Sequence, residues 1–349
     1  MSDAPTQSAP RTPDPGDAGV GVGGPLGTPE APITPTPAAS SKTVTRPGDR
    51  VFTSMATGSA VFISVLIGAI GAFLVWRAVP ALARNEVNFL TSTTWDTDNI
   101  NSMAFGVLDL FQVTVLVSVF ALALAMPVAL GIAIFLTEYS PKRLARPLAY
   151  VIDLLAAVPS IVYGLWGLLI FAPAIKPLAL WLNENLSWIP LFATGSGSIA
   201  GGGTIFTAGI VLAVMILPII TAVTREVFVQ TPTAQIEAAL ALGATKWEVV
   251  KTTIIPFGKS GYISGSMLGL GRALGETMAL YMILRTTSKA FGWSLFDSGS
   301  TIASKIALGY AEFNNEIQAG AYIAVGLVLF ILTFVVNAAA RAAIAGKRA

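Results

Sequence analysis

Six long apolar segments limit what this chain can fold into more than any other feature of its sequence. A helix that crosses a bilayer needs about 20 mostly apolar residues, because the hydrocarbon core is about 30 Å thick and each residue advances about 1.5 Å. The segments are residues 55–76, 113–136, 148–171, 206–224, 262–283 and 319–340. The sequence therefore predicts an all-α polytopic membrane protein with six transmembrane helices.

The composition argues against most soluble classes of protein. Charged residues make up 11% of the chain and hydrophobic residues 54%, whereas an ordinary soluble domain has about 25% charged residues. The net charge of +2 gives no electrostatic footprint for nucleic acid. Because the chain has no Cys and no His, thiolate nucleophiles and the usual general base are missing. We expect no catalytic residue, no metal site and no nucleic-acid partner.

The first 50 residues differ in kind from the rest. They hold ten of the 21 prolines, many Gly, Thr and Ser residues, and no apolar run. Such a segment buries too little apolar surface to offset the entropy of ordering it. We predict a disordered Pro/Gly/Thr-rich cytoplasmic tail at 1–50 and a transmembrane domain at 51–349. A Pro-rich docking ligand is the alternative, and no repeated core motif supports it.

Lys and Arg residues predict the orientation of the chain, because cytoplasmic loops carry an excess of both. Counted from Lys42 onward, the two ends and the loops after the second and fourth segments hold 13 of them, whereas the loops after the first, third and fifth segments hold six. The six spans are even in number, so both ends lie on one side. We therefore expect a multi-pass protein of the plasma membrane with both termini in the cytoplasm.

The long loop between the fourth and fifth segments contains a pattern of helix boundaries. Thr231, followed by a proline, is typical of a helix start, and Gly243 is typical of a left-handed helix end. The run Thr245-Lys-Trp-Glu248 has the spacing of a capping box. We predict a hairpin of two short helices, the first at 232–242, and we expect Pro256 to keep the second from running on.

This loop is similar to the EAA loop of ABC-transporter permeases. It departs mildly from the family pattern at Thr253, where Ile is usual, and at Ile255, where another aliphatic residue, Leu, is usual. The matching residues are Glu237, Ala238, Ala239, Gly243, Ile255 and Pro256. The resemblance implies a six-span permease of the type I ABC importers, with a cytoplasmic coupling loop at 225–259. It also implies that the first four of these residues dock the loop in a groove of an ATP-binding subunit and pass its motion to the spans.

An amphipathic hairpin lying on the lipid surface is the alternative for this loop. Few Lys or Arg residues and no large apolar stripe on its exposed face make that alternative weaker. No phosphate-binding G-x-x-x-x-G-K-[ST] motif occurs in the chain. We therefore expect ATP and Mg²⁺ to be bound by a separate ATPase subunit, and we expect this chain to be a transport subunit with no cofactor of its own and no enzymatic activity.

The fifth segment combines a glycine stripe with two charged residues. Gly261, Gly265 and Gly269 recur every four residues, which builds a face for close helix contact. Arg272 and Glu276 continue that stripe and are four residues apart, so they can pair. A charge at this depth costs about 2.5–3.5 kcal/mol on insertion scales and is a functional candidate. The two residues either line a translocation path for an oxyanion, which a guanidinium fork suits, or form a buried ion pair that fixes helix register.

A second resemblance narrows the family. Residues 128–138, 157–167 and 269–277 are similar to phosphate-specific permease subunits (the PstC family), and the likeness covers about residues 50–340. In that family an Arg and a Glu of this helix are implicated in phosphate passage, and the matching positions are Arg272 and Glu276. The resemblance implies as partners a paralogous PstA-like permease, two copies of a PstB-like ATPase and an extracytoplasmic PstS-like phosphate-binding protein, all assembled at a lipid bilayer.

Two further polar residues lie near a proline in the third segment. Ser160 and Tyr163 flank the bend expected at Pro159, where they could line the path. The alternative for Ser160 is a hydrogen bond to a carbonyl of the preceding turn.

Two acidic residues are assigned other places. Asp153 is expected to pair with Arg143 or Arg146 near the cytoplasmic end of the third segment. Asp109 is expected to cap a helix or to face water on the outer side.

These features together predict the permease subunit of an ATP-driven importer that moves inorganic phosphate into the cytoplasm. A permease for another oxyanion, such as molybdate or sulfate, is the nearest alternative. A secondary transporter or channel that needs no ATPase is an alternative of another class. An intramembrane hydrolase is more distant, because Ser160 has no His and no evident Lys nearby.

Overall fold

The computed structural model of the chain describes residues 47–100, 102–286, 291–310 and 315–345. The chain divides into two units, Met1–Gly58 and Ser59–Ala349. Helix α1 (Pro47–Leu82) begins in the first unit and continues in the second. Most of the tail predicted at 1–50, that is residues 1–46, lies outside the described residues.

The described residues are mainly helical, and the only strands among them form one small hairpin. After α1, the helices are α2 (Leu108–Ile134), α3 (Lys142–Ala156), α4 (Ser160–Trp166), α5 (Ala172–Leu186), α6 (Ile205–Val229), α7 (Thr233–Ala241), α8 (Lys246–Val249), α9 (Ile255–Leu274), α10 (Met278–Ile283), α11 (Ile302–Gly309) and α12 (Glu316–Ala345). Strands β1 (Trp95–Asp96) and β2 (Ala104–Phe105) are antiparallel, with Trp95 opposite Phe105. Single π-helical turns at Phe135–Tyr139, Gly167–Phe171 and Val250–Ile254 follow α2, α4 and α8.

Five helical segments of the described residues are long and apolar enough to cross a membrane. They are Gly48–Leu82, Leu108–Tyr139, Ser160–Leu186, Ile205–Val229 and Glu316–Ala342. Four of them contain the segments predicted at 55–76, 113–136, 206–224 and 319–340, so these four predictions are confirmed as helices of spanning length. The other two predicted spans are interrupted.

The prediction of one helix at 148–171 is wrong, because the backbone leaves the helical conformation just before α4. Helix α3 ends at Ala156, and Pro159 has a ψ of 136°. Proline has no N–H to donate to the preceding turn, and its ring disfavours a helical conformation in the residue before it. The apolar stretch of spanning length therefore starts at Ser160 and runs through α5.

The prediction of one helix at 262–283 is wrong as well. Helix α9 ends at Leu274, and α10 starts at Met278 after a break at Gly275, Glu276 and Thr277. The 20 residues of α9 span about 30 Å at 1.5 Å per residue. Helix α9 therefore has the length of a span, although its glycines and charged residues make it much less apolar than the five segments above.

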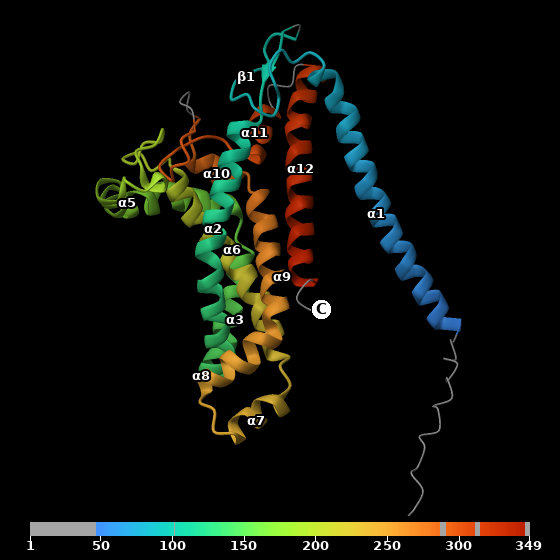
Figure 1. Cartoon of the computed structure of the whole chain (residues 1–349), viewed down its shortest axis with the longest axis vertical. Helices are drawn as coiled ribbons and strands as arrows, with labels where there is room; N and C mark the ends of the chain where they lie inside the picture. Colours follow the sequence, from blue (N-terminus) through green and yellow to red (C-terminus); the bar gives the residue numbers. More distant parts are fainter. Residues whose placement is uncertain (1–46, 101, 287–290, 311–314, 346–349) are drawn as a thin grey trace, which may run out of the picture. The chain divides into compact units, whose positions relative to one another are not determined.

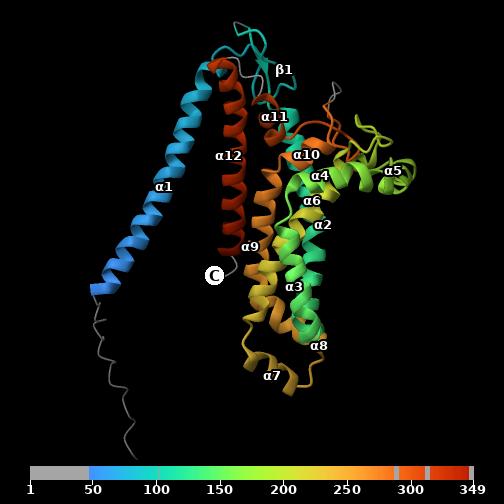
Figure 2. The ribbon, with the colours of Figure 1, turned by 180° about the vertical axis from the view of Figure 1, so that it is seen from behind.

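Helix α6 lies at the centre of the bundle, with α2 and α9 beside it (Figures 1 and 2). The glycine stripe of α9 packs on α6, as its spacing predicts. A Cβ at residue 265 would lie 3.0 Å from the Cβ of Val223, and one at residue 269 would lie 2.8 Å from Cγ1 of Ile220. These glycines therefore allow a helix contact that larger side chains would hold apart.

Helix α12 packs against the last turns of α1 at the end of the bundle that carries the β1–β2 hairpin. The carbonyl oxygen of Arg77 lies 2.9 Å from a Cβ placed at Gly320. Arg77 also donates a hydrogen bond of 3.1 Å to Glu316. Phe105 of β2 is fully buried in a cluster with Ala78 and Ala81 of α1 and residues of α12. We call this end of the bundle the hairpin end.

Helices α7 and α8 lie at the opposite end of the bundle (Figure 1), which we call the α7 end. The capping box is confirmed, because Thr245 Oγ1 accepts from the backbone N–H of Glu248 at 3.4 Å and Glu248 Oε2 accepts from that of Thr245 at 2.7 Å. Gly243 has a φ of 85°, as expected for a left-handed helix end. Thr231, however, does not cap α7, since its hydroxyl has no hydrogen-bond partner among the described residues.

The second helix of the predicted hairpin does not stop at Pro256. It continues from α8 through the π-helical turn at Val250–Ile254 into α9. Pro256 lies in the first turn of α9, where a proline is tolerated because the missing N–H has little structural consequence. The loop therefore contains one separate short helix, α7, followed directly by the first turns of a long one.

Candidate substrate site at two interrupted helices

The break between α9 and α10 is built around the side chain of Glu276. This residue is 7% exposed, and its Oε1 accepts a hydrogen bond of 3.1 Å from the backbone N–H of Ala279 in the first turn of α10. Its own N–H donates to the carbonyl of Ala273 in the last turn of α9 at 3.3 Å. Glu276 therefore satisfies backbone groups of both helix ends, which would otherwise lack partners.

The break between α3 and α4 is supported by the side chain of Tyr163. Its hydroxyl donates a hydrogen bond of 2.9 Å to the carbonyl oxygen of Leu155 in the last turn of α3. Tyr163 is 8% exposed. The phenol therefore satisfies a carbonyl that loses its helical partner where Pro159 interrupts the chain, much as Glu276 serves the other break.

These two breaks lie side by side because α4 packs closely on α10. A Cβ placed at Gly164 would lie 2.9 Å from the Cα of Ala279 and 3.2 Å from the Cβ of Met282. Gly164 directly follows Tyr163, and Ala279 is the residue whose N–H Glu276 accepts. Two helices that each lose their regular hydrogen bonds therefore meet at one level of the bundle, and substrate sites of membrane transporters are typically formed by such discontinuous helices.

Arg272 lies in the last turn of α9, immediately before this pair of breaks. Its side chain is partly exposed. Arg272 and Glu276 are both described residues, and no ion pair within 4.0 Å joins them. The spacing of four residues brings side chains together only on a continuous helix, and this helix ends at Leu274 between them.

Ser160 is the remaining residue predicted for the path. It is the first residue of α4 and is partly exposed. Its hydroxyl makes no hydrogen bond to any described residue, so the expected bond to a carbonyl of the preceding turn is absent. The structure thus brings Arg272, Glu276 and Tyr163 to the paired breaks, with Ser160 one turn from Tyr163 on α4.

The residues predicted for ATPase coupling lie on an almost fully exposed helix at the α7 end. Helix α7 has no buried residue. Glu237 and Ala238 are exposed, and Ala239 is half-buried against a cluster that contains Phe228 and Ile254. Leu242 just beyond the helix is 90% exposed. An exposed leucine beside a row of alanines offers a low-relief apolar surface to another protein.

Two expectations for acidic residues are corrected by the structure. Asp153 lies 4.0 Å from Arg225 of α6 and is not paired with either arginine of α3 in the described part of the chain. Because α3 packs against α6, the arginine that reaches Asp153 comes from the neighbouring helix. Asp109 neither caps α2 nor turns fully to water, because its Oδ1 is buried and has no hydrogen-bond partner within the described ranges.

That Glu276 supports a helix break was not predicted from the sequence. The signal was present in Gly275-Glu276-Thr277, since glycine favours a helix end and an acidic residue with a threonine favours the next helix start. Apolar residues on both sides hid this signal. They made the segment resemble a single span.

The comparisons with known proteins agree on one family of transport proteins. A family model described as "Binding-protein-dependent transport system inner membrane component" matches residues 125–348. The phosphate transport system permease protein PstC 2 of Mycobacterium tuberculosis is 59% identical over 304 residues, which are 86% of this chain and 93% of that protein. PstC of Mycobacterium leprae is 58% identical, over 90% of this chain and 99% of that protein. PstC of Xylella fastidiosa (strain Temecula1) is 39% identical, over 84% of this chain and 89% of that protein.

Several helices of membrane-spanning length around two facing helix breaks, with an exposed short helix at one end, are features of membrane transport proteins. The chain belongs to the family of binding-protein-dependent transport system inner membrane components. The recognition of an ABC importer permease from its EAA loop is thereby confirmed.

Proposed function

We propose that this chain is the permease subunit of an ATP-driven importer that carries inorganic phosphate across the plasma membrane. The observation that carries the proposal is the pair of facing helix breaks with the Arg272 guanidinium beside them and no carboxylate paired to it among the described residues. The relatives at 58% and 59% identity bear the name of phosphate transport permeases, which supports phosphate as the substrate.

Arg272 is assigned the role of receiving the anion. A guanidinium presents a planar fork of donors that matches two oxygens of a tetrahedral oxyanion, and it keeps its charge at any physiological pH. The phenol of Tyr163 lies at the same pair of helix breaks and donates to the carbonyl oxygen of Leu155. A phosphate that pairs with Arg272 thus need not first displace an intramolecular carboxylate.

Glu276 holds the geometry of this place in the proposed mechanism. Its carboxylate accepts from Ala279 and thereby fixes the start of α10, which packs on α4 next to Tyr163. A rigid backbone break keeps the guanidinium and the anion in register, and a nearby negative charge prevents the anion from being held too tightly for release. Both effects favour release of the substrate after it has bound, which transport requires.

The proposal assigns α7 to energy coupling. Glu237, Ala238, Ala239 and Gly243 form the surface that a separate ATPase subunit grips, and that subunit binds ATP and Mg²⁺. Helix α8 continues through the π-helical turn into α9. A displacement of α8 beside α7 is therefore transmitted to Arg272 along one continuous helical segment. Closure of an ATPase dimer would in this way open the opposite side of the permease.

The assembly that follows from this mechanism has a second, paralogous permease, an ATPase dimer and a binding protein that delivers phosphate. The family name itself specifies dependence on a binding protein. The excess of Lys and Arg on one side supports the α7 end and both termini in the cytoplasm. The hairpin end then faces the binding protein outside.

Uptake by the purified four-component transporter in proteoliposomes tests this function. Radiolabelled phosphate should accumulate only when the ATPase subunit, ATP inside the vesicles and the binding protein are all present. Unlabelled phosphate should compete at equal concentration, and sulfate or molybdate should not. Preferential uptake of sulfate or molybdate would transfer the assignment to another oxyanion. Phosphate uptake driven by a membrane potential without the ATPase would place the chain among secondary transporters.

A further inference from the structure

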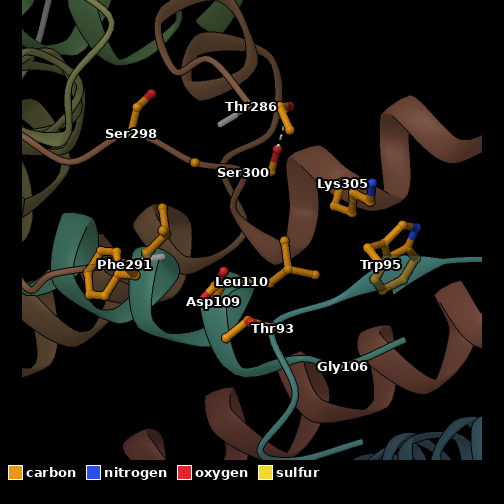
Figure 3. Close-up of a pocket in the computed structure, with 12 residues that line it drawn as sticks. Thr93, Trp95, Gly106, Asp109, Leu110, Thr286, Phe291, Ser298, Ser300 and Lys305 are labelled. Carbon is orange, nitrogen blue, oxygen red and sulfur yellow. Dashed lines mark hydrogen bonds between the residues drawn. The ribbon is translucent and has the colours of Figure 1, made fainter. Parts of the chain in front are cut away.

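A polar pocket at the hairpin end lies apart from the paired helix breaks. Its volume is about 110 Å³. The segments that form it are the loop before β1, the start of α2, Thr286 after α10, residues 291 and 298–300, and α11. Figure 3 shows the side chains that surround it. The polar residues that line it are Thr93, Asp109, Thr286, Ser298, Ser300 and Lys305.

The pocket contains one carboxylate, that of Asp109, which makes no hydrogen bond to any described residue. Oδ1 of Asp109 is buried and makes no hydrogen bond to any described residue. Figure 3 shows its carboxyl group on the first turn of α2, directed into the space below Ser300. An ionised carboxylate can only accept hydrogen bonds. A ligand that pairs with this carboxylate must therefore bring a donor of its own.

The other polar groups of the pocket suit an anion. Lys305 of α11 supplies a positive charge, and its Nζ lies 4.8 Å from the centre of the Trp95 ring. The hydroxyls of Thr286 and Ser300 lie 3.4 Å apart on the opposite wall. A hydroxyl can rotate to donate to an anionic oxygen. The pocket thus offers a cation and hydroxyl donors to an anion, together with the acceptor carboxylate of Asp109.

Close packing gives the pocket a fixed shape. A Cβ at Gly106 would collide with the carbonyl oxygen of Ser92, and a Cβ at Gly299 would lie 3.0 Å from Cγ2 of Val113. The backbone N–H of Ile302 donates 2.9 Å to the hydroxyl of Thr114, which ties the start of α11 to α2. The walls that carry Asp109 and Lys305 are therefore joined directly.

We propose that this pocket is a second anion site, which binds an oxyanion that still carries a proton and rejects one that does not. Inorganic phosphate keeps a P–OH group at neutral pH, and this group donates to the Asp109 carboxylate while Lys305 and the hydroxyls bind the other oxygens. Arsenate has the same form. Sulfate has no proton to donate, and neither has a phosphodiester such as a lipid headgroup. Each would therefore place an unprotonated, negatively charged oxygen against the Asp109 carboxylate, with no hydrogen bond to offset the repulsion.

This proposal deepens the proposed function, on which it rests, by adding a selection step before the substrate reaches Arg272. The pocket is at the hairpin end, which the proposed orientation places outside. An anion released there by a binding protein would bind in the pocket only if it carries a proton. Asp109 then acts on selectivity, and Arg272 acts on passage.

Protection of a single cysteine tests the pocket without measuring transport. The chain has no cysteine of its own, so Thr93→Cys introduces one thiol at the pocket wall, and its labelling by an anionic methanethiosulfonate can be followed by mass spectrometry of this chain. The assembled transporter is used, at constant ionic strength. Phosphate and arsenate at millimolar concentration should slow labelling at least about threefold. Sulfate and dimethyl phosphate should leave it unchanged.

Two matched controls define the specificity of this result. Thr91→Cys lies on the same loop, is exposed and does not line the pocket, so no anion should protect it. In the Thr93→Cys background, Asp109→Asn should let sulfate protect as well as phosphate does, because the carboxamide has no charge and donates from its nitrogen. Asp98→Asn, an exposed acid outside the pocket, should leave the selectivity unchanged. If Asp109→Asn fails to assemble, Lys305→Met serves instead and should abolish protection by phosphate.

Equal protection by phosphate and sulfate with Asp109 intact would overturn the proposal, and so would the absence of protection by phosphate. Failure of the proposed function has a different outcome. In that case, uptake of phosphate in proteoliposomes is missing while protection of Thr93→Cys persists. Normal uptake with no protection would overturn the pocket alone.

Discussion

Gly164 of α4 lies directly against the backbone of Ala279 of α10, so closely that a Cβ at residue 164 would stand 2.9 Å from the Ala279 Cα. This contact brings the two helix breaks to one level. On the α4 side it is next to Tyr163, and on the α10 side it includes the N–H group that Glu276 accepts. The candidate substrate site therefore depends on a glycine that has no chemical role of its own.

Replacing this glycine should destabilise the site. Gly164→Ala adds a methyl group against backbone, which cannot move aside as a side-chain end can, and overpacking of this kind costs about 1–3 kcal/mol. This outweighs the gain of up to about 1 kcal/mol from better helix propensity. We expect a lower melting temperature of the purified transporter and slower uptake. Gly131→Ala in α2, where a Cβ would meet nothing within 4 Å, is the control and should not lower stability. Equal effects of the two substitutions would contradict the close contact.

Substitutions of Glu276 separate its hydrogen bond from its charge. Glu276→Ala removes the acceptor for Ala279 N–H, and loss of a capping side chain typically costs about 0.5–2 kcal/mol. Glu276→Gln keeps an acceptor oxygen at the same reach. The supporting role predicts that the glutamine variant retains clearly more stability and uptake than the alanine variant. If both variants lose uptake equally while the glutamine variant melts like the wild type, the charge and not the helix break is what transport requires.

The spanning helices could largely be predicted from the sequence, whereas the breaks could not. A run of about 20 apolar residues is enough to predict α1, α2, α6 and α12, because the bilayer dictates length and polarity together. The same criterion joined α4 to the wrong neighbour, and it merged α9 with α10. The apolar content of a segment indicates that it lies in the membrane. It does not indicate where the backbone hydrogen bonds of a helix are interrupted. Pro159 and Gly275 carried that local information.

The residues of the candidate site were predicted from the sequence, but their arrangement in space was not. Arg272, Glu276, Ser160 and Tyr163 were all singled out from the sequence, and their part in transport remains a prediction. Helical spacing suggested an ion pair between the first two, and the break removed the helix on which that spacing depends. Asp109 and Lys305 are far apart in the sequence and belong to loops and helix ends, where no periodic pattern connects them. Only the folded chain brings them to one pocket.

The exposed surface beside α7 should be needed for ATPase binding. Leu242 is 90% exposed, and Leu242→Glu would place a charge in the proposed apolar contact. We expect the ATPase subunit to dissociate more readily during purification and ATP-driven uptake to fall at least about tenfold. The control is Leu90→Glu at the hairpin end, where a leucine is also 63% exposed. Loss of the ATPase subunit in both variants, or in neither, would contradict docking at α7.

The capping box at the start of α8 should weaken in acid. Hydrogen bonds from the backbone and hydroxyl of Thr245 hold the pKa of the Glu248 carboxyl below its usual value. A group whose pKa is lower in the folded state contributes stability above its unfolded pKa and loses it as the pH falls through the folded pKa. Amide hydrogen exchange at Thr245 and Glu248, corrected for intrinsic rates, should therefore accelerate below that pKa. Glu248→Gln, which still fits a capping box, should remove the pH dependence, and its persistence in this variant would assign it to another group.

Uptake by an Arg272→Gln variant tests the central claim most directly, namely that this guanidinium beside the paired breaks receives the anion. The variant is reconstituted with the partner subunits, and its assembly and ATP hydrolysis are compared with those of the wild type. Glutamine keeps hydrogen-bonding capacity and loses the charge, so we expect phosphate uptake to fall at least about tenfold while assembly persists. Arg225→Gln, at the far end of α6 near Asp153, is the control for loss of a positive charge and should retain uptake. Phosphate uptake and selectivity unchanged in a correctly assembled Arg272→Gln transporter would contradict the account.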